Sequence, residues 1–149
     1  MAVIDIARTN VLTESPDASV ASVVRQIHDN DVAGLVIVED GTPLDLVTAR
    51  DLLRGVLDDE FDAENTPVRE FIDDGIPTVE ADEGMYELVE LLSEHGLRRI
   101  PVVEDGELAG IISVSDVVVL LGMELQHVAN AIRSSSPAYE RSGFDYYDS

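Results

Sequence analysis

The sequence repeats itself with an offset of 65 residues, from Val38 to Val103, and this repeat limits the possible folds more than any other feature. The run Val-Glu-Asp-Gly at 38–41 recurs at 103–106, and no insertion is needed to extend the alignment over both halves. The chain of 149 residues is therefore predicted to contain two copies of one small unit. Further pairs in the same register are Val3 and Val68, Thr13 and Thr78, Asp17 and Asp82, Thr48 and Ser113, and Asp51 and Asp116.

Hydrophobic spacing predicts the same order of elements, β-α-β-β-α, in each copy after a short N-terminal segment (3–7 and 68–72). Apolar residues at i, i+3, i+4 and i+7 from Val20 and from Met85 indicate amphipathic helices, with Ser19 and Gly84 as N-caps. Asp-Gly between apolar runs indicates a hairpin in each copy. The predicted strands are 10–13, 35–38 and 44–47, then 76–79, 100–103 and 108–112, and the closing helices begin near Asp51 and Asp116, the second running to about Arg133.

A single copy of about 55 residues would be marginally stable, so the two copies are predicted to pack face to face around a shared core. The fold class is α/β, of the α+β type: two tandem units related by pseudo-twofold symmetry, with two related clefts. The predicted boundaries are 1–57 for the first repeat, 58–66 for a polar, acidic linker, and 67–133 for the second repeat. Residues 134–149 are predicted to be a disordered tail.

Charge is the strongest compositional constraint, because 31 acidic residues face only nine basic ones, all of them arginine. A net charge of −22 makes binding to nucleic acid or to an anionic membrane unfavourable. Excess carboxylate without lysine is typical of proteins from salt-accumulating halophiles, since a Debye length of about 3 Å at 1 M salt screens the repulsion. An acidic protein from a non-halophile is the alternative.

Other classes of protein are disfavoured by what the sequence lacks. No apolar run reaches the roughly 20 residues of a membrane span, and the N-terminus has no basic start of a secretory signal, so a cytoplasmic location is predicted. The absence of cysteine excludes disulfides and thiolate chemistry. Three scattered histidines form no metal-ligand cluster, and no cofactor is expected to be required.

The run Gly110 to Asp116 has the pattern of a buried strand that turns into a helix. The first N–H groups of a helix lack partners within it and favour anions, while hydroxyls and a carboxylate suit a phosphorylated sugar. Ser113, Ser115 and Asp116 supply these groups, and Thr48 and Asp51 repeat the pattern in the first copy. The alternative is that these side chains only cap their helices.

This combination resembles the CBS domain pair, also called a Bateman module, over about residues 1–130. The marks of the resemblance are Leu97 to Val103 and the Gly-hydrophobic-x-Ser-x-x-Asp pattern that ends at Asp116. The first copy departs from the pattern, with Val36 where the second copy has Pro101 and Asp45 where it has Gly110.

The resemblance implies a regulatory module that binds AMP, ADP, ATP or S-adenosylmethionine in the clefts between repeats. It also implies a homodimer. By position, Asp116 would hold the ribose hydroxyls, Ser113 and Ser115 would meet phosphate or ribose, Arg98 and Arg99 would contact phosphate, and Thr78 and Ile100 would line the adenine. The matching, weaker site of the first copy is Thr13, Ala33, Gly34, Thr48, Arg50 and Asp51.

Arg98 and Arg99 are the only adjacent basic pair in a strongly acidic chain, and a phosphate entering such a field needs local cations. The first copy has Ala33 and Gly34 at these positions, which favours one competent phosphate site. Neighbouring residues of an extended segment point in opposite directions, so the two arginines are expected to serve different clefts. The alternative is a pair of surface salt bridges.

The leading hypothesis is a nucleotide-sensing module whose occupancy alters the docking of an unidentified partner protein. It is expected to be no enzyme, because the sequence has no nucleophile with a base, no metal cluster and no phosphate loop. A dimerisation scaffold with vestigial clefts and no ligand is the alternative.

Overall fold

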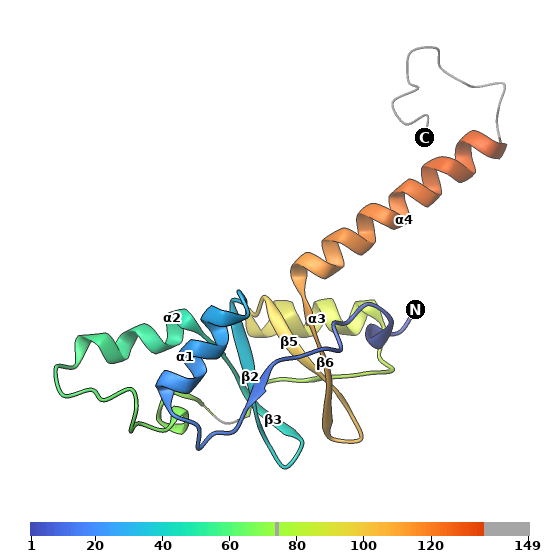
Figure 1. Cartoon of the computed structure of the whole chain (residues 1–149). Coiled ribbons are helices and arrows are strands. Elements are labelled where there is room, and N and C mark those ends of the chain that lie inside the picture. The colour runs from blue at the N-terminus through green and yellow to red at the C-terminus, as the bar shows by residue number, and fades with distance from the viewer. Residues whose placement is uncertain (74, 136–149) are drawn as a thin grey trace, which may run out of the picture. The chain divides into compact units, whose positions relative to one another are not determined.

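The computed structural model describes residues 1–73 and 75–135, so the predicted tail lies outside the described residues from 136 onward. Residues 1–114 form one compact unit, and a second unit begins at Ser115. The first unit contains two three-stranded sheets, and the second contains most of helix α4 (Val114–Ser135) (Figure 1). The predicted mixed α/β fold with two repeated units is confirmed.

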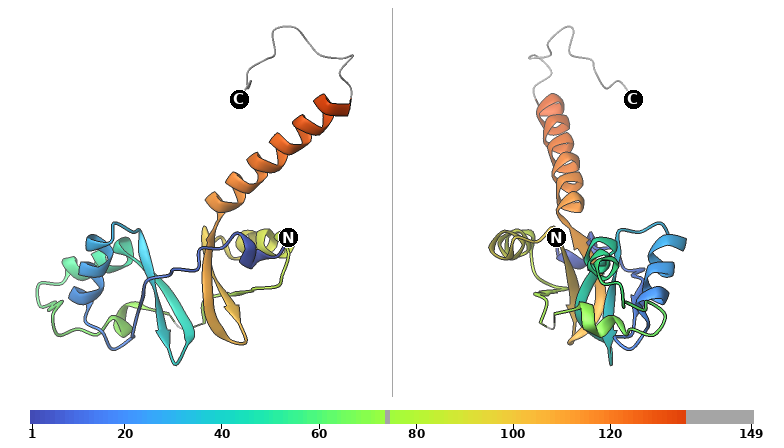
Figure 2. Two further views of the ribbon diagram at one scale, coloured as in Figure 1. Left: turned by 45° about the vertical axis from the view of Figure 1, so that its right-hand side comes forward. Right: turned by 90° about the vertical axis from the view of Figure 1, so that its left-hand side faces the viewer.

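The two sheets are built alike. Each has a parallel pair followed by an antiparallel hairpin, with the orders β1-β2-β3 and β4-β5-β6. Strand β3 contacts both β5 and β6, so the sheets meet within the first unit (Figure 2). The bounds are β1 Thr13–Glu14, β2 Gly34–Glu39, β3 Thr42–Thr48, β4 Val79–Glu80, β5 Arg99–Glu104 and β6 Glu107–Ser113, and the helices are α1 Val20–Asp29, α2 Ala49–Leu52 and α3 Met85–His95.

The offset of 65 residues holds in the pairing of the strands. Gly34 pairs with Thr48 as Arg99 pairs with Ser113, and both hairpins have a register shift at the same aligned place. Both hairpin turns have an aspartate followed by a glycine at positive φ, at 52° and 81° for Asp40-Gly41. Two consecutive positive φ values define a type I′ turn, which the Asp-Gly signal predicted.

The first strand of each copy is shorter and later than predicted. Only Thr13 and Glu14 form β1, and only Val79 and Glu80 form β4. Pro77 has no backbone N–H to donate, so it cannot extend the ladder of the second copy. The first closing helix is short, because α2 gives way to a 3₁₀ helix at Leu53–Leu57. Helix α4 begins at Val114 and ends at Ser135, two residues past the predicted end.

The N-terminal segments are exchanged between the repeats. The 3₁₀ helix Val3–Asp5 of the first copy binds the second, because Val3 N–H donates to the Glu83 carbonyl at 2.8 Å. The aligned 3₁₀ helix Val68–Phe71 binds the first copy, where Val68 N–H donates to the Ala18 carbonyl at 2.8 Å. The segment that precedes each repeat in the sequence therefore completes the structure of the other repeat.

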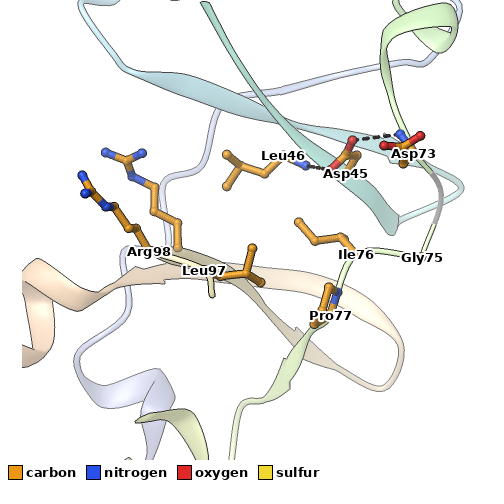
Figure 3. A pocket seen from close by; sticks show the side chains of 9 residues that line it. Asp45, Leu46, Asp73, Gly75, Ile76, Pro77, Leu97 and Arg98 are labelled. Atoms are coloured by element: carbon orange, nitrogen blue, oxygen red, sulfur yellow. Dashed lines mark hydrogen bonds between the residues drawn. The ribbon is translucent and has the colours of Figure 1, made fainter. Parts of the chain in front are cut away.

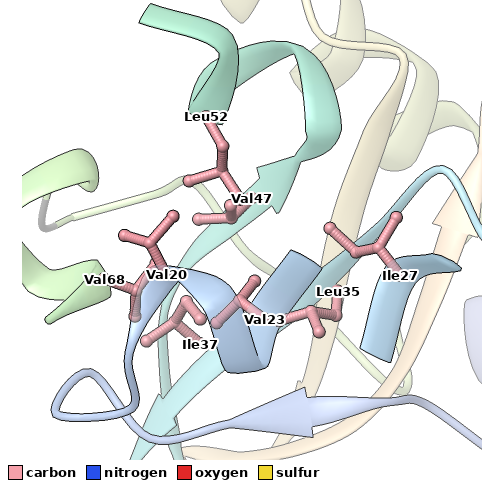
Figure 4. Close-up of a cluster of buried hydrophobic side chains, with 8 residues drawn as sticks. All are labelled: Val20, Val23, Ile27, Leu35, Ile37, Val47, Leu52 and Val68. Atoms are coloured by element: carbon pink, nitrogen blue, oxygen red, sulfur yellow. The ribbon is translucent and has the colours of Figure 1, made fainter. Parts of the chain in front are cut away.

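The core of the first repeat confirms this exchange (Figure 4). Val20, Val23 and Ile27 of α1 pack against Leu35 and Ile37 of β2, together with residues from β3, α2 and the exchanged segment. Val24, predicted on the same helix face, is instead exposed, and so is its counterpart Val89, so the buried face is narrower than predicted. The remaining members of the cluster are Val47, Leu52 and Val68.

The acidic stretch 58–66 is packed against the first repeat and is not a free linker. The Val20 N–H donates to the Thr66 carbonyl and the Ala21 N–H to the Ala63 carbonyl, each at 2.9 Å. The ring of Phe61 meets that of Phe71 edge to face, with centroids 5.5 Å apart. The composition predicted a solvated linker because carboxylates outnumber apolar residues in this stretch. The few apolar residues and the backbone hydrogen bonds are nevertheless enough to hold it against the first repeat.

Candidate functional site

A cavity of about 390 Å³ opens in the first compact unit where three segments meet. Strand β3 contributes Asp45 and Leu46, the segment before β4 contributes residues 73 and 75–77, and the turn before β5 together with its first residue contributes residues 97–99. Figure 3 shows Asp45 and Asp73 together on one side of this cavity and Arg98 on another. Acidic and basic side chains therefore line different walls.

Asp45 accepts two backbone hydrogen bonds at the wall of the cavity. One carboxylate oxygen accepts a hydrogen bond from the Leu46 N–H at 2.8 Å, and the other accepts one from the Asp73 N–H at 3.1 Å (Figure 3). Burial raises the pKa of Asp45 above its usual value, and these two hydrogen bonds oppose the shift only in part. Each oxygen keeps a second lone pair, so the carboxylate can accept further hydrogen bonds from a ligand.

The second repeat shows what Asp45 replaces. There the aligned residue is Gly110, and the flanking strand pairs directly, with Arg8 and Ile111 exchanging two backbone hydrogen bonds of 2.9 Å. A Cβ at Gly110 would come within 2.8 Å of the Arg8 carbonyl oxygen, so a side chain does not fit this pairing. In the first repeat both aligned N–H groups donate to the Asp45 carboxylate instead. The aspartate thus holds the two segments apart beside the cavity.

Arg98 and Arg99 both line this one cavity. The expectation that they serve different clefts is therefore not met, because Arg98 precedes β5 and strand alternation does not govern its direction. Their backbones are fixed by the sheet: the Arg98 carbonyl accepts from the Val114 N–H at 2.9 Å, and Arg99 pairs with Ser113. Guanidinium groups on a cavity wall are suited to bind phosphate or carboxylate oxygens.

Other residues of the predicted main site lie elsewhere. Ile100 is fully buried in the core, next to Arg99 but without a surface on the cavity. Thr78 is partly exposed and directly precedes β4, and Ser113 ends β6. Ser115 and Asp116 lie in the first turn of α4, in the second compact unit, so their part in ligand binding stays a prediction.

Some residues of the weaker predicted site have a structural role in the fold. Asp51 forms a capping box with Thr48: its carboxylate accepts from the Thr48 N–H at 2.8 Å, while the Asp51 N–H donates to the Thr48 hydroxyl at 3.3 Å. The capping alternative therefore holds for this copy. A Cβ at Gly34 would lie 2.3 Å from the Val47 carbonyl oxygen, so close strand packing requires this glycine. Ala33 precedes β2, and Thr13 begins β1.

A second cavity, of about 470 Å³, lies beside the first and shares Asp45, Leu46 and Asp73 with it. Its other lining residues include Arg50, Asp51 and Arg54. The Arg54 guanidinium stacks 4.5 Å above the Phe71 ring and donates to the Glu70 carbonyl at 2.8 Å, so this arginine is engaged. Within the second cavity, Arg54 is therefore already bound to other groups of the protein.

Sequence reasoning did not place Asp45 in the candidate site. Asp45 appeared only as a departure from the family pattern, and Asp73 was not considered. The signal was the repeat itself, because a carboxylate that replaces glycine at a crowded aligned position must change the local pairing. Leu46, Ile76, Pro77 and Leu97 also line the cavity; the first three lay in predicted strands, and only Leu97 lay in a stretch that marks the family resemblance.

Residues 1–73 and 75–135 contain no group of three or more His, Cys, Asp or Glu side chains that could hold a metal ion. Over the same residues, no helix combines the length and apolar character needed to cross a bilayer.

Comparison with known proteins assigns both repeats to the same family. The family model of the CBS domain matches residues 3–58 and 68–122. Protein MK0525 of Methanopyrus kandleri is 30% identical over 116 residues, covering 76% of this chain and 59% of that protein. The chain spans smaller shares, 42% and 30%, of two relatives from Methanocaldococcus jannaschii.

Solved structures of CBS proteins share the fold. The CBS domain pair of protein MJ0100, in complex with 5′-methylthioadenosine and S-adenosyl-L-methionine, superimposes with a TM-score of 0.70 at 20% identity, covering 83% of this chain and 98% of that one. CBSX2 in complex with AMP gives a TM-score of 0.70 at 23% identity, covering 84% and 98%.

Proposed function

We propose that this chain, which belongs to the CBS domain family, is a regulatory module that binds an adenosine-containing ligand in the cavity lined by Asp45, Arg98 and Arg99. The observation that carries the proposal is the division of charge within that cavity. A pair of arginines lies on one wall and a hydrogen-bonded carboxylate on another, in a chain whose net charge is −22. Anion binding in such a chain depends on local cations.

The chemistry of the walls matches the parts of a nucleotide. A volume of about 390 Å³ lies within the usual range of small-molecule sites. Arg98 and Arg99 would donate to phosphate oxygens, and the free lone pairs of Asp45 would accept from the ribose hydroxyls. The apolar side chains of Leu46 and Leu97 offer surface for the base.

The family likeness adds ligands and residues to the proposal. Two proteins of the same fold hold AMP, or 5′-methylthioadenosine with S-adenosyl-L-methionine, which supports an adenosine compound here as well. The family pattern also assigns ligand contacts to a set of residues that this cavity does not include. They are Thr78, Ile100, Ser113, Ser115 and Asp116, and of the first-copy positions Thr13, Ala33, Gly34, Thr48, Arg50 and Asp51.

The ligand would act by shifting a population and not through catalysis. A bound nucleotide favours whichever arrangement of the segments around the cavity it binds best, and it can alter a partner's docking only by that difference in affinity. We therefore propose a binding protein that regulates a partner and no enzymatic step. The acidic, lysine-free composition would keep such a module in solution at high salt.

Calorimetric titration with AMP, ATP and 5′-methylthioadenosine tests the site. Arg98→Gln and Arg99→Gln should weaken AMP and ATP by about 10- to 100-fold, the scale of one charged hydrogen bond. 5′-Methylthioadenosine carries no phosphate, so the same variants should leave its affinity unchanged. Asp45→Asn should weaken all three ligands, because all carry the ribose diol.

Arg25→Gln is the matched control, since it removes the same charge from an exposed arginine that pairs with Glu64 away from the cavity. Equal losses in Arg25→Gln and Arg98→Gln would show that only the overall charge matters, and the site would be wrong. Asp116→Ala separately tests the ribose role assigned by the family pattern. No heat with any ligand would favour the alternative function, a scaffold without a ligand.

A further inference from the structure

The charged side chains that line the first cavity balance one another. Asp45 and Asp73 are acidic, and Arg98 and Arg99 are basic; among the residues that the structure describes, no other charged side chain lines this cavity. The two carboxylates lie together, and Arg98 lies on another side (Figure 3). One phosphate group thus meets two arginines, whereas each additional phosphate finds no further arginine among the described lining residues.

The acidic side of the cavity is held in place. The Asp45 carboxylate accepts from the Leu46 N–H and the Asp73 N–H, so it cannot turn away from the cavity without losing both hydrogen bonds. Burial is the main cause of the raised pKa of Asp45, two backbone hydrogen bonds oppose it, and the negative charges of Asp51 and Asp73 raise the pKa further. Three carboxylates therefore lie near enough to repel one another, and they would also repel a phosphate.

The neighbouring cavity of about 470 Å³ does not supply the missing positive charge. Its described lining contains two arginines, Arg50 and Arg54, and three aspartates, Asp45, Asp51 and Asp73. Arg54 is already bound to other groups of the protein. A chain of phosphates that extended from the first cavity into the second would therefore approach an excess of negative charge.

We infer that Asp73 is a specificity-determining residue, which restricts the ligand to adenosine compounds with no more than one phosphate. The inference rests on the proposed function, because it concerns the same cavity. A single phosphate group carries a charge of about −2 near pH 7, and the two arginines can neutralise it. The two further phosphates of ATP would have to lie beside Asp45 and Asp73 without a cation to offset the repulsion.

Asp73→Asn is the variant that tests this role, because it removes one negative charge and keeps the backbone N–H that Asp45 accepts. The Asp73 side chain is exposed, so the variant is expected to fold. Asp59→Asn is the matched control, since it makes the same change at an exposed position that does not line either cavity. Calorimetric titration of the full chain with 5′-methylthioadenosine, AMP and ATP should omit divalent cations, which would neutralise the phosphates, and should use the lowest KCl concentration at which circular dichroism shows the fold.

The unaltered chain should bind ATP at least about 10-fold more weakly than AMP. Asp73→Asn should reduce this ratio by about 3- to 10-fold and leave the affinity for 5′-methylthioadenosine unchanged, while Asp59→Asn should change the ratio less than about 2-fold. A role of Asp73 in the fold alone would instead weaken all three ligands equally, and that result would overturn the inference.

Failure of the inference and failure of the proposed function give different results. If Arg98→Gln weakens AMP but ATP binds the unaltered chain as tightly as AMP does, the cavity is the site and the role of Asp73 is wrong. The same holds if Asp73→Asn and Asp59→Asn change the ratio equally. A lack of heat with all three ligands, or equal losses in Arg98→Gln and Arg25→Gln, would overturn the proposed function and this inference with it.

Discussion

Asp45 offers the sharpest test of how the cavity is built, because one side chain accepts two backbone N–H groups that the second repeat satisfies differently. Asp45→Asn keeps the size of the side chain but turns one acceptor into a donor. One N–H group then faces an NH₂ group and loses its partner. Leaving this N–H group without a hydrogen bond costs about 1 to 3 kcal/mol. The asparagine is uncharged, so the cost of burying a charged side chain disappears, which offsets part of this loss.

We expect a net loss of about 1 to 2 kcal/mol in the free energy of unfolding near pH 7. Guanidinium chloride unfolding, followed by circular dichroism, measures this change from the shift in midpoint at constant slope. Asp59→Asn, the same change at an exposed position, is the control and should stay within about 0.5 kcal/mol. A difference below that limit for Asp45→Asn would show that the carboxylate does not hold the two segments.

The pH dependence of this difference gives an independent check. The folded chain raises the pKa of Asp45, so protonation stabilises the fold. This contribution is fully present below the unfolded value, about 3.9, and is lost as the pH rises through the higher folded value. The advantage of the unaltered chain over Asp45→Asn should therefore grow as the pH falls from 7 toward 4. A shrinking advantage would contradict the assigned direction.

Three other expectations concern stability. Gly34→Ala should destabilise the fold by about 2 kcal/mol or more, because its Cβ would lie 2.3 Å from the Val47 carbonyl oxygen. Gly122→Ala has open space around it and should stabilise the fold by up to about 1 kcal/mol. Thermal unfolding measures both changes. Val68→Ala should cost about 1.5 to 3 kcal/mol in chemical unfolding, and exposed Val56→Ala close to nothing. Circular dichroism should show structure lost in dilute buffer and regained in molar KCl, and an unchanged spectrum would refute salt dependence.

The repeat was sufficient to predict most of the architecture. The hairpin turns at Asp40-Gly41 and Asp105-Gly106 followed from local turn chemistry, and the helices that begin at Val20 and Met85 followed from apolar spacing. Both signals are local, so neighbouring residues alone decide them. The shift of β1 to Thr13–Glu14 was not visible, because two-residue strands depend on which partner groups remain free.

Contacts distant in sequence could not be predicted. Nothing in the composition of the 58–66 stretch indicates that Phe61 meets Phe71, and no pattern states that Val3 binds beside Glu83. The candidate site was anticipated at Arg98 and Arg99, whose charge stands out against an acidic chain. It was missed at Asp45, whose role depends on a backbone N–H group at Asp73 that only the fold brings near.

The exchange of N-terminal segments sets the order in which the polypeptide can mature during synthesis. The first half leaves the ribosome lacking Val68, which arrives only after the whole of that half has been made. Val3 and Ile4, synthesised at the start, must wait until their acceptors, the Glu83 and Ala81 carbonyls, emerge. A gene cut between the halves would thus encode two incomplete products, and melting of the intact chain should proceed as one cooperative event.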